Sequence, residues 1–216
     1  MKVIFLGDSI TEGVGASCEE TRYVNVFQKI SGAEVGNFGV SGTRIARQTT
    51  PTACRTFDYD FQMRAEVMDK DADMVFVFGG TNDYGHGDAP VGEENDTSPY
   101  TFYGGLNNLT DKLTKIYGKE KINFILPLRR FDEESVYGQG NRKFPTLNLK
   151  GYVDIIRSFC EKRGIGYIDL YNHGFPAPLT NTGDEYTVDG LHPNDKGHAL
   201  VAERIKEYVD GKLSAL

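Results

Sequence analysis

Two polar segments near opposite ends of the sequence carry the residue types of nucleophilic catalysis. Ser9 follows Asp8 directly after a short apolar run, where a helix N-terminus would supply free backbone N–H groups that favour an alkoxide or an oxyanion. Asp189 and His192 lie three residues apart, close enough for the carboxylate to orient one imidazole nitrogen. The other nitrogen would then be free to take a proton from a serine.

Two further segments offer hydrogen-bond donors, and each of the candidate residues also has an ordinary structural interpretation. Gly39 could present its backbone N–H without a side chain in the way, and Asn82 could offer its side-chain amide. On their own, however, Asp8 and Ser9 suit a helix N-cap, Gly39 a tight turn and Asn82 an Asx-turn. The chemistry therefore depends on whether the fold brings the four segments together.

A metal site is an alternative use of the histidines. Asp189, His192 and His198 could share a metal ion, but no fourth ligand is evident and the spacing matches no known zinc site, so we expect none. Gly39-Val40-Ser41-Gly42 is one residue too short for the Gly-x-Ser-x-Gly nucleophile elbow, which argues against the α/β-hydrolase template. The phosphate-binding Gly-x-x-x-x-Gly-Lys-Ser/Thr motif is missing, and we expect no cofactor.

The elements that must position these residues alternate between strand and helix. Apolar, β-rich runs predict five strands, and several are continuous enough for burial on both faces, as in a parallel sheet. Apolar residues at helical spacing separate them. This order favours an open, doubly wound α/β sheet in a single domain, residues 1–216, with ligands at the carboxyl ends of the strands. The expected strands are residues 2–6, 34–40, 73–78, 122–128 and 165–170, and the expected helices are 23–30, 102–117, 147–160 and one from about Asn194.

Composition excludes several kinds of partner. The 216 residues include 24 Lys and Arg against 31 Asp and Glu, and the net charge of −7 disfavours nucleic acid and anionic membrane surfaces. No apolar run is long enough for a membrane span, and the N-terminus does not resemble a secretory signal. Cys18, Cys54 and Cys160 are odd in number and far apart, as expected of reduced thiols. We therefore expect a cytoplasmic protein; its oligomeric state is not indicated.

The four segments, in this order, resemble the SGNH (GDSL) serine hydrolases, a family of esterases and lipases. Ser9 in Gly-Asp-Ser, Gly39, Asn82 in Gly-x-Asn-Asp and His192 in Asp-x-x-His match the four motifs of the family and span nearly the whole chain. The resemblance implies a flavodoxin-like, three-layer αβα sandwich with a five-stranded parallel sheet. It also implies that Ser9 is the nucleophile, that His192 is the base oriented by Asp189, and that Ser9, Gly39 and Asn82 form the oxyanion hole.

The loops should select the ester. In such a family the candidates are small acyl esters, acetylated sugars, lysophospholipids and acyl-thioesters. Residues 84–99 and 129–145 are long polar segments without an apolar face for a fatty chain, so we favour a small acyl ester, acetylated carbohydrate among the candidates. Asp8, Arg129, Arg130 and Tyr137 are weaker candidates for substrate contact, with a solvated charged loop as the alternative. A lipid hydrolase of the same family, or a binding module without activity, remain the other interpretations.

Overall fold

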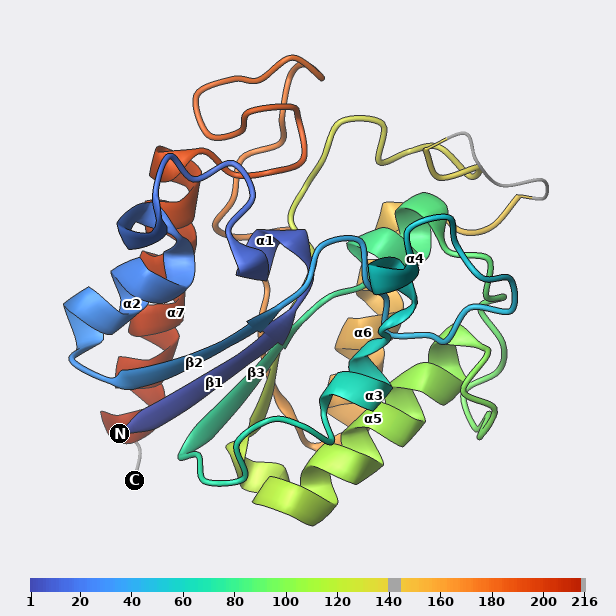
Figure 1. Ribbon diagram of the computed structural model, residues 1–216, viewed down its shortest axis with the longest axis horizontal. Helices are drawn as coiled ribbons and strands as arrows, with labels where there is room; N and C mark the ends of the chain where they lie inside the picture. Colours follow the sequence, from blue (N-terminus) through green and yellow to red (C-terminus); the bar gives the residue numbers. More distant parts are fainter. Residues whose placement is uncertain (140–144, 215–216) are drawn as a thin grey trace.

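A five-stranded parallel sheet forms the centre of the molecule. The computed structural model describes residues 1–139 and 145–214 (Figure 1). The strand order is β2-β1-β3-β4-β5, so the chain moves outward from β1 to β2 and then crosses back over β1 to reach β3. Such a reversal opens a crevice between the carboxyl ends of β1 and β3, where ligands bind in this class of sheet. The strands are β1 (Lys2–Gly7), β2 (Glu34–Gly39), β3 (Met74–Phe78), β4 (Ile122–Ile125) and β5 (Gly166–Ile168).

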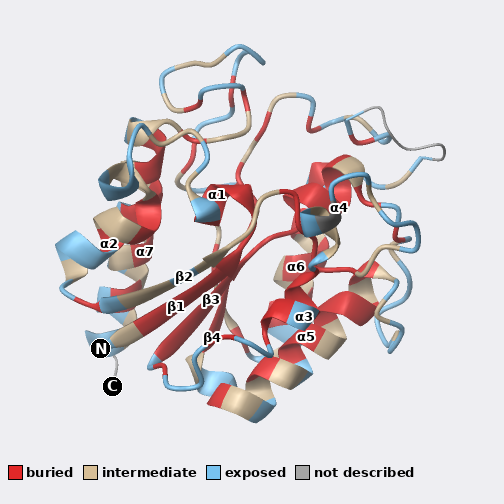
Figure 2. Ribbon diagram, viewed as in Figure 1, coloured by how far each residue is buried: buried red, intermediate tan, exposed pale blue. Residues whose placement is uncertain are grey.

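Helices cover both faces of the sheet because its central strands are apolar on both sides. In β1, Val3 and Phe5 face one helical layer, whereas Ile4 and Leu6 face the other. All five residues of β3 are buried, as Figure 2 shows in red. Burying each such side chain contributes about 1.5–3 kcal/mol, which fixes the sheet between the layers. One layer holds α2 (Tyr23–Ser31) and α7 (Asp195–Ser214), and the other holds α3 (Phe61–Arg64), α5 (Phe102–Tyr117) and α6 (Leu149–Arg163).

The predicted αβα sandwich and its five parallel strands are confirmed, with several shifted boundaries. The fourth strand was expected to run to residue 128 but ends at Ile125, two residues before Pro127, which has no N–H for a ladder. The helix expected over 147–160 begins after the cap Asn148, whose side chain accepts a hydrogen bond from the Gly151 N–H. Residues 84–99 were expected to be a loop, but their first three residues belong to α4 (Thr81–His86).

The strands deliver two short helices and two loops to one end of the sheet. In Figure 1 the strand arrows point up toward α1 (Ser9–Glu12), α4 and the loops that precede α6 and α7. All four candidate segments thus reach the same edge of the fold.

None of the helices formed by residues 1–139 and 145–214 is long and apolar enough to cross a membrane. The three cysteines are free thiols.

Candidate active site

Ser9 is held at the N-terminus of α1, directly after β1. Asp8 caps this helix, and its side chain accepts a hydrogen bond from the Ile10 N–H at 3.0 Å. Ser9 is the first helical residue, so its backbone N–H has no acceptor within the helix and is available to a ligand. The residue is 6% exposed, and its exposed part lines an open cavity of about 510 Å³. A reactive hydroxyl and a free N–H are therefore presented together.

The turn before α7 places an imidazole against this serine. Ser9 Oγ and His192 Nε2 are 3.0 Å apart, and His192 Nδ1 lies 2.7 Å from Asp189 Oδ2. Since Nδ1 donates to the carboxylate, Nε2 is the acceptor for the serine proton. The three residues come from segments 180 positions apart in the chain, yet they form one continuous chain of hydrogen bonds.

Asp189 is itself fixed by the turn that carries it. Its Oδ1 accepts hydrogen bonds from the backbone N–H groups of Leu191 (3.0 Å) and His192 (2.7 Å), while Gly190 adopts φ +76° between them. Desolvation alone would raise the pKa of Asp189, but the hydrogen bonds from the side chain and backbone of His192 and from Leu191 hold it below its ordinary value. The carboxylate therefore stays ionised and able to stabilise an imidazolium.

Asn82 projects from the first turn of α4 into the same cavity. Its Nδ2 donates to the Thr43 carbonyl at 3.0 Å, and its Oδ1 lies 3.0 Å from His86 Nε2. The second amide hydrogen of Nδ2 has no acceptor among the described residues. Ser9, Asn82 and His192 all line the cavity, so this hydrogen is available at the place where charge would develop on an attacked ester.

The structure does not bring Gly39 to the cavity, contrary to the sequence interpretation. Its N–H donates to Asn37 Oδ1 at 2.9 Å, and an added Cβ would meet the Glu12 backbone nitrogen at 2.1 Å. Gly39 is therefore needed for close packing of β2 against α1. Gly42 lines the cavity instead, and its N–H has no acceptor in the described part of the chain. The turn that carries Gly42 is anchored by a hydrogen bond from the Ser41 N–H to Glu12 Oε2 at 2.6 Å.

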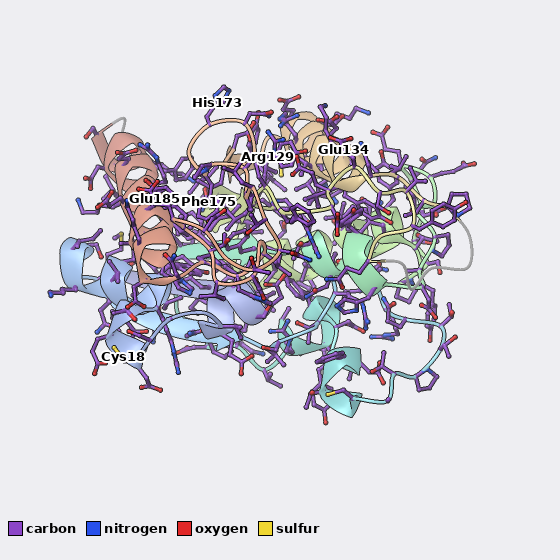
Figure 3. The ribbon with its side chains drawn as sticks, turned by 90° about the horizontal axis from the view of Figure 1, so that it is seen from above. Cys18, Arg129, Glu134, His173, Phe175 and Glu185 are labelled. Carbon is purple, nitrogen blue, oxygen red and sulfur yellow. The ribbon has the colours of Figure 1, made fainter. Side chains whose placement is uncertain are left out.

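The expected substrate contacts are distributed differently. Arg129, labelled in Figure 3, forms an ion pair with Glu133 and lies 4.8 Å from the centre of the Tyr171 ring. Tyr137 is 47% exposed. Neither Arg129 nor Tyr137 lines the cavities beside His192. The two residues are therefore not placed for the expected substrate contact, because Arg129 is ion-paired with Glu133 and because Tyr137 is exposed to solvent.

Arg130, by contrast, does lie beside the site. It is buried, lines a neighbouring cavity of about 290 Å³ with Asp189 and His192, and donates from Nη1 to Thr81 Oγ1 at 3.1 Å. Asp8 is buried as a helix cap away from both cavities, and desolvation raises its pKa to about 6, so we assign it to structure. Residues 140–144 of the polar segment 129–145 lie outside the described residues.

His198 has a structural place and is not beside Asp189 and His192 as a metal ligand. Its Nδ1 accepts a hydrogen bond from the Tyr23 N–H at 3.2 Å, and its Nε2 lies 3.2 Å from the Val14 carbonyl oxygen. Burial lowers its pKa to about 4. Among residues 1–139 and 145–214, no three His, Cys, Asp or Glu side chains are grouped as metal ligands.

Comparison with known proteins decides the family. The model of the GDSL-like lipase/acylhydrolase family matches residues 5–200. The chain belongs to this family. It is therefore a hydrolase of the GDSL lipase/acylhydrolase class, and the resemblance stated from its four motifs is confirmed. No curated protein matches the sequence significantly.

Solved structures share the GDSL-family fold over nearly the full chain. A protein from Lactobacillus plantarum is 27% identical, with a TM-score of 0.77 over 97% of this chain and 96% of that one. The lipase/acylhydrolase from Enterococcus faecalis is 22% identical (TM-score 0.66, 98% and 96% covered). Est24, a carbohydrate acetylesterase from Sinorhizobium meliloti, is 15% identical (TM-score 0.69, 97% and 98% covered). The last two likenesses establish the fold alone.

Proposed function

We propose that this GDSL-family chain is a serine esterase that hydrolyses small acyl esters, with acetylated carbohydrates as the favoured class. The observation that carries the proposal is the linear hydrogen-bond chain from Ser9 Oγ through His192 to Asp189, with separations of 3.0 and 2.7 Å, at the wall of an open cavity. A nucleophile, a base and a group that orients the base are the minimum set for acyl transfer.

The mechanism follows from the direction of these hydrogen bonds. Ser9 Oγ attacks the ester carbonyl as its proton passes to His192 Nε2, and Asp189 stabilises the resulting imidazolium. The oxyanion is bound by the backbone N–H groups of Ser9 and Gly42 and by the Asn82 amide. When the tetrahedral intermediate collapses, the bond to the leaving alcohol breaks and His192 protonates that alcohol. Water, activated by the same imidazole, then attacks the acyl-enzyme and releases the acid and Ser9.

The cavity favours a short acyl group. Only Val14, Phe57 and Leu191 among its lining residues have apolar side chains, so the cavity offers little apolar surface against which a long chain could lose its contact with water. A fatty chain would leave most of its surface wetted, which removes the driving force for its binding. A sugar, by contrast, can use the polar positions around the cavity. The existence of a carbohydrate acetylesterase on the same fold is compatible with this choice.

A chain-length series of nitrophenyl esters tests the proposal. We expect the highest kcat/KM for acetyl or butyryl esters, and loss of turnover in Ser9→Ala with the fold retained, because an alanine fits the first turn of α1. A maximum at octanoyl or longer esters would replace the short-acyl proposal with a lipid hydrolase. Turnover by Ser9→Ala close to that of the parent chain would overturn the nucleophile assignment, and absence of turnover in the parent chain would favour a binding module.

A further inference from the structure

A hydrogen-bond chain runs from the buried Arg44 through His86, which lines the same cavity as Ser9, to Asn82. Arg44 is 2% exposed, and its Nη2 donates to His86 Nδ1 and, at 3.3 Å, to the His86 carbonyl oxygen. His86 Nε2 in turn lies 3.0 Å from Asn82 Oδ1. Asn82 and His86 are one helical turn apart on α4, so their side chains share a face of the helix.

The chemistry of the three groups allows only one direction of donation. A guanidinium has donors and no acceptor, so His86 Nδ1 must accept from Arg44. The neutral imidazole then carries its proton on Nε2 and donates it to Asn82 Oδ1. The Asn82 Nδ2 faces the Thr43 carbonyl, which can only accept, and this contact fixes the same orientation of the amide independently.

Contacts of neighbouring residues hold Arg44, the first donor of this hydrogen-bond chain, in place. Asp83 Oδ2 accepts from the Ile45 N–H at 3.0 Å, and its Oδ1 accepts from the Ala46 N–H at 2.9 Å, which ties the segment around Arg44 to α4. Arg44 also donates from Nη1 to the Phe57 carbonyl at 3.4 Å. The segment that carries Arg44 and the helix that carries Asn82 are therefore one connected unit.

We propose that His86 is a positioning residue for the oxyanion donor Asn82, and that Arg44 selects the Nε2–H tautomer that this role requires. The inference rests on the proposed esterase function and deepens it. With His86 donating to Oδ1 and Thr43 accepting from Nδ2, the amide cannot rotate, and its second hydrogen stays aimed into the cavity. A donor fixed before the reaction need not reorient as charge develops on the ester oxygen.

Matched substitutions of His86 separate this role from substrate contact. His86→Gln can keep an N–H near the position of Nε2, whereas His86→Asn can replace only the acceptor near Nδ1. We expect His86→Ala and His86→Asn to lower kcat on nitrophenyl acetate by about tenfold or more, up to the 10²–10³ expected for loss of one oxyanion donor, at little change in KM. His86→Gln should restore much of this loss. His173→Ala, an exposed histidine at the edge of the molecule in Figure 3, is the control and should match the parent chain.

A double-substitution cycle gives the decisive result. In the Asn82→Ala background, removal of His86 should cost less than about twofold in kcat, because the group that it orients is already absent. Independent, multiplying losses, a change confined to KM, or kcat of His86→Ala within about twofold of the parent would each overturn the proposal. If instead Asn82→Ala itself leaves kcat unchanged, Asn82 is not an oxyanion donor, and the proposed function is refuted at that point. This outcome is distinct from a failure of the positioning role of His86 alone.

The tautomer can be observed without turnover. In ¹⁵N-labelled protein, long-range proton–nitrogen correlations of the His86 ring should show a protonated Nε2 and an unprotonated Nδ1. This measurement does not depend on substrate, so it can also be made on variants with little activity. A ring protonated on Nδ1 would contradict donation from Arg44 and would overturn the proposal even if kcat fell in the variants.

Discussion

Replacement of the buried His198 should remove a specific part of the pH dependence of stability. His198 is 0% exposed, and its two ring nitrogens contact the backbone of Tyr23 and Val14, which joins α7 to α2 and to the segment after α1. Burial penalises the charged imidazole, and its pKa falls from 6.5 to about 4 in the fold. Between these two values the unfolded chain binds the proton more readily than the folded chain, so His198 makes the fold less stable as the pH falls.

The size of the effect follows from the two pKa values. The difference of 6.5 − 4 = 2.5 units corresponds to about 3 kcal/mol at pH values below both. Between about pH 7 and about pH 5, proton binding to the unfolded chain accounts for about 2 kcal/mol of it. Glutamine in place of His198 retains a polar group but does not titrate. The parent chain should therefore lose about 2 kcal/mol of unfolding free energy relative to His198→Gln over this interval.

Urea unfolding of both proteins at the two pH values measures this difference directly. The comparison must be between proteins, because other buried groups titrate in the opposite sense and can mask the effect in the parent chain alone. A free-energy difference between parent and His198→Gln that is the same at both pH values would refute the burial argument. A difference that changes in favour of the parent at the lower pH would refute its sign.

Three further predictions test neighbouring parts of the account. Desolvation raises the pKa of Asp8 from 3.8 to about 6, so its ionisation destabilises the fold as the pH rises through this window. From about pH 5 to about pH 7, Asp8→Asn should therefore gain about 1 kcal/mol of unfolding free energy relative to the parent in urea titrations. A change of opposite sign would contradict this. Gly39→Ala places a Cβ 2.1 Å from a backbone nitrogen of α1 and should destabilise the protein by about 1–3 kcal/mol; an unchanged thermal transition would show that the packing is looser than described. Asn82→Ala should lower kcat by about 10²–10³ in steady-state kinetics, and an effect on KM alone would assign Asn82 to substrate binding.

The sequence predicts the sheet because burial on both faces leaves a direct pattern. The run from Met74 to Phe78 is apolar at every position, and all of it is buried. The ends of such elements depend on local chemistry that the pattern does not contain, as Pro127 and the cap Asn148 show. The order of the motifs, rather than any one of them, indicates a common edge, since each motif alone also suits a cap or a turn.

The donor glycine and the residues that orient Asn82 could not be read in the same way. Gly39, the last residue of β2, and Gly42 lie three residues apart, and only the packing against α1 shows which of them reaches the cavity. The spacing of four residues between Asn82 and His86 was a usable signal, but it was hidden because residues from position 84 onward were interpreted as a loop. Arg44 comes from a separate segment and meets His86 only through tertiary structure.

Covalent labelling tests the central claim, that Ser9 is the nucleophile activated by His192 and Asp189. An organophosphonate should react at Ser9 alone, and mass spectrometry of the digested protein should place the whole adduct on the peptide that contains Gly7-Asp8-Ser9. His192→Ala should slow this reaction strongly, because the serine then has no base. An adduct on another serine, or labelling of Ser9 at an unchanged rate in His192→Ala, would contradict the account.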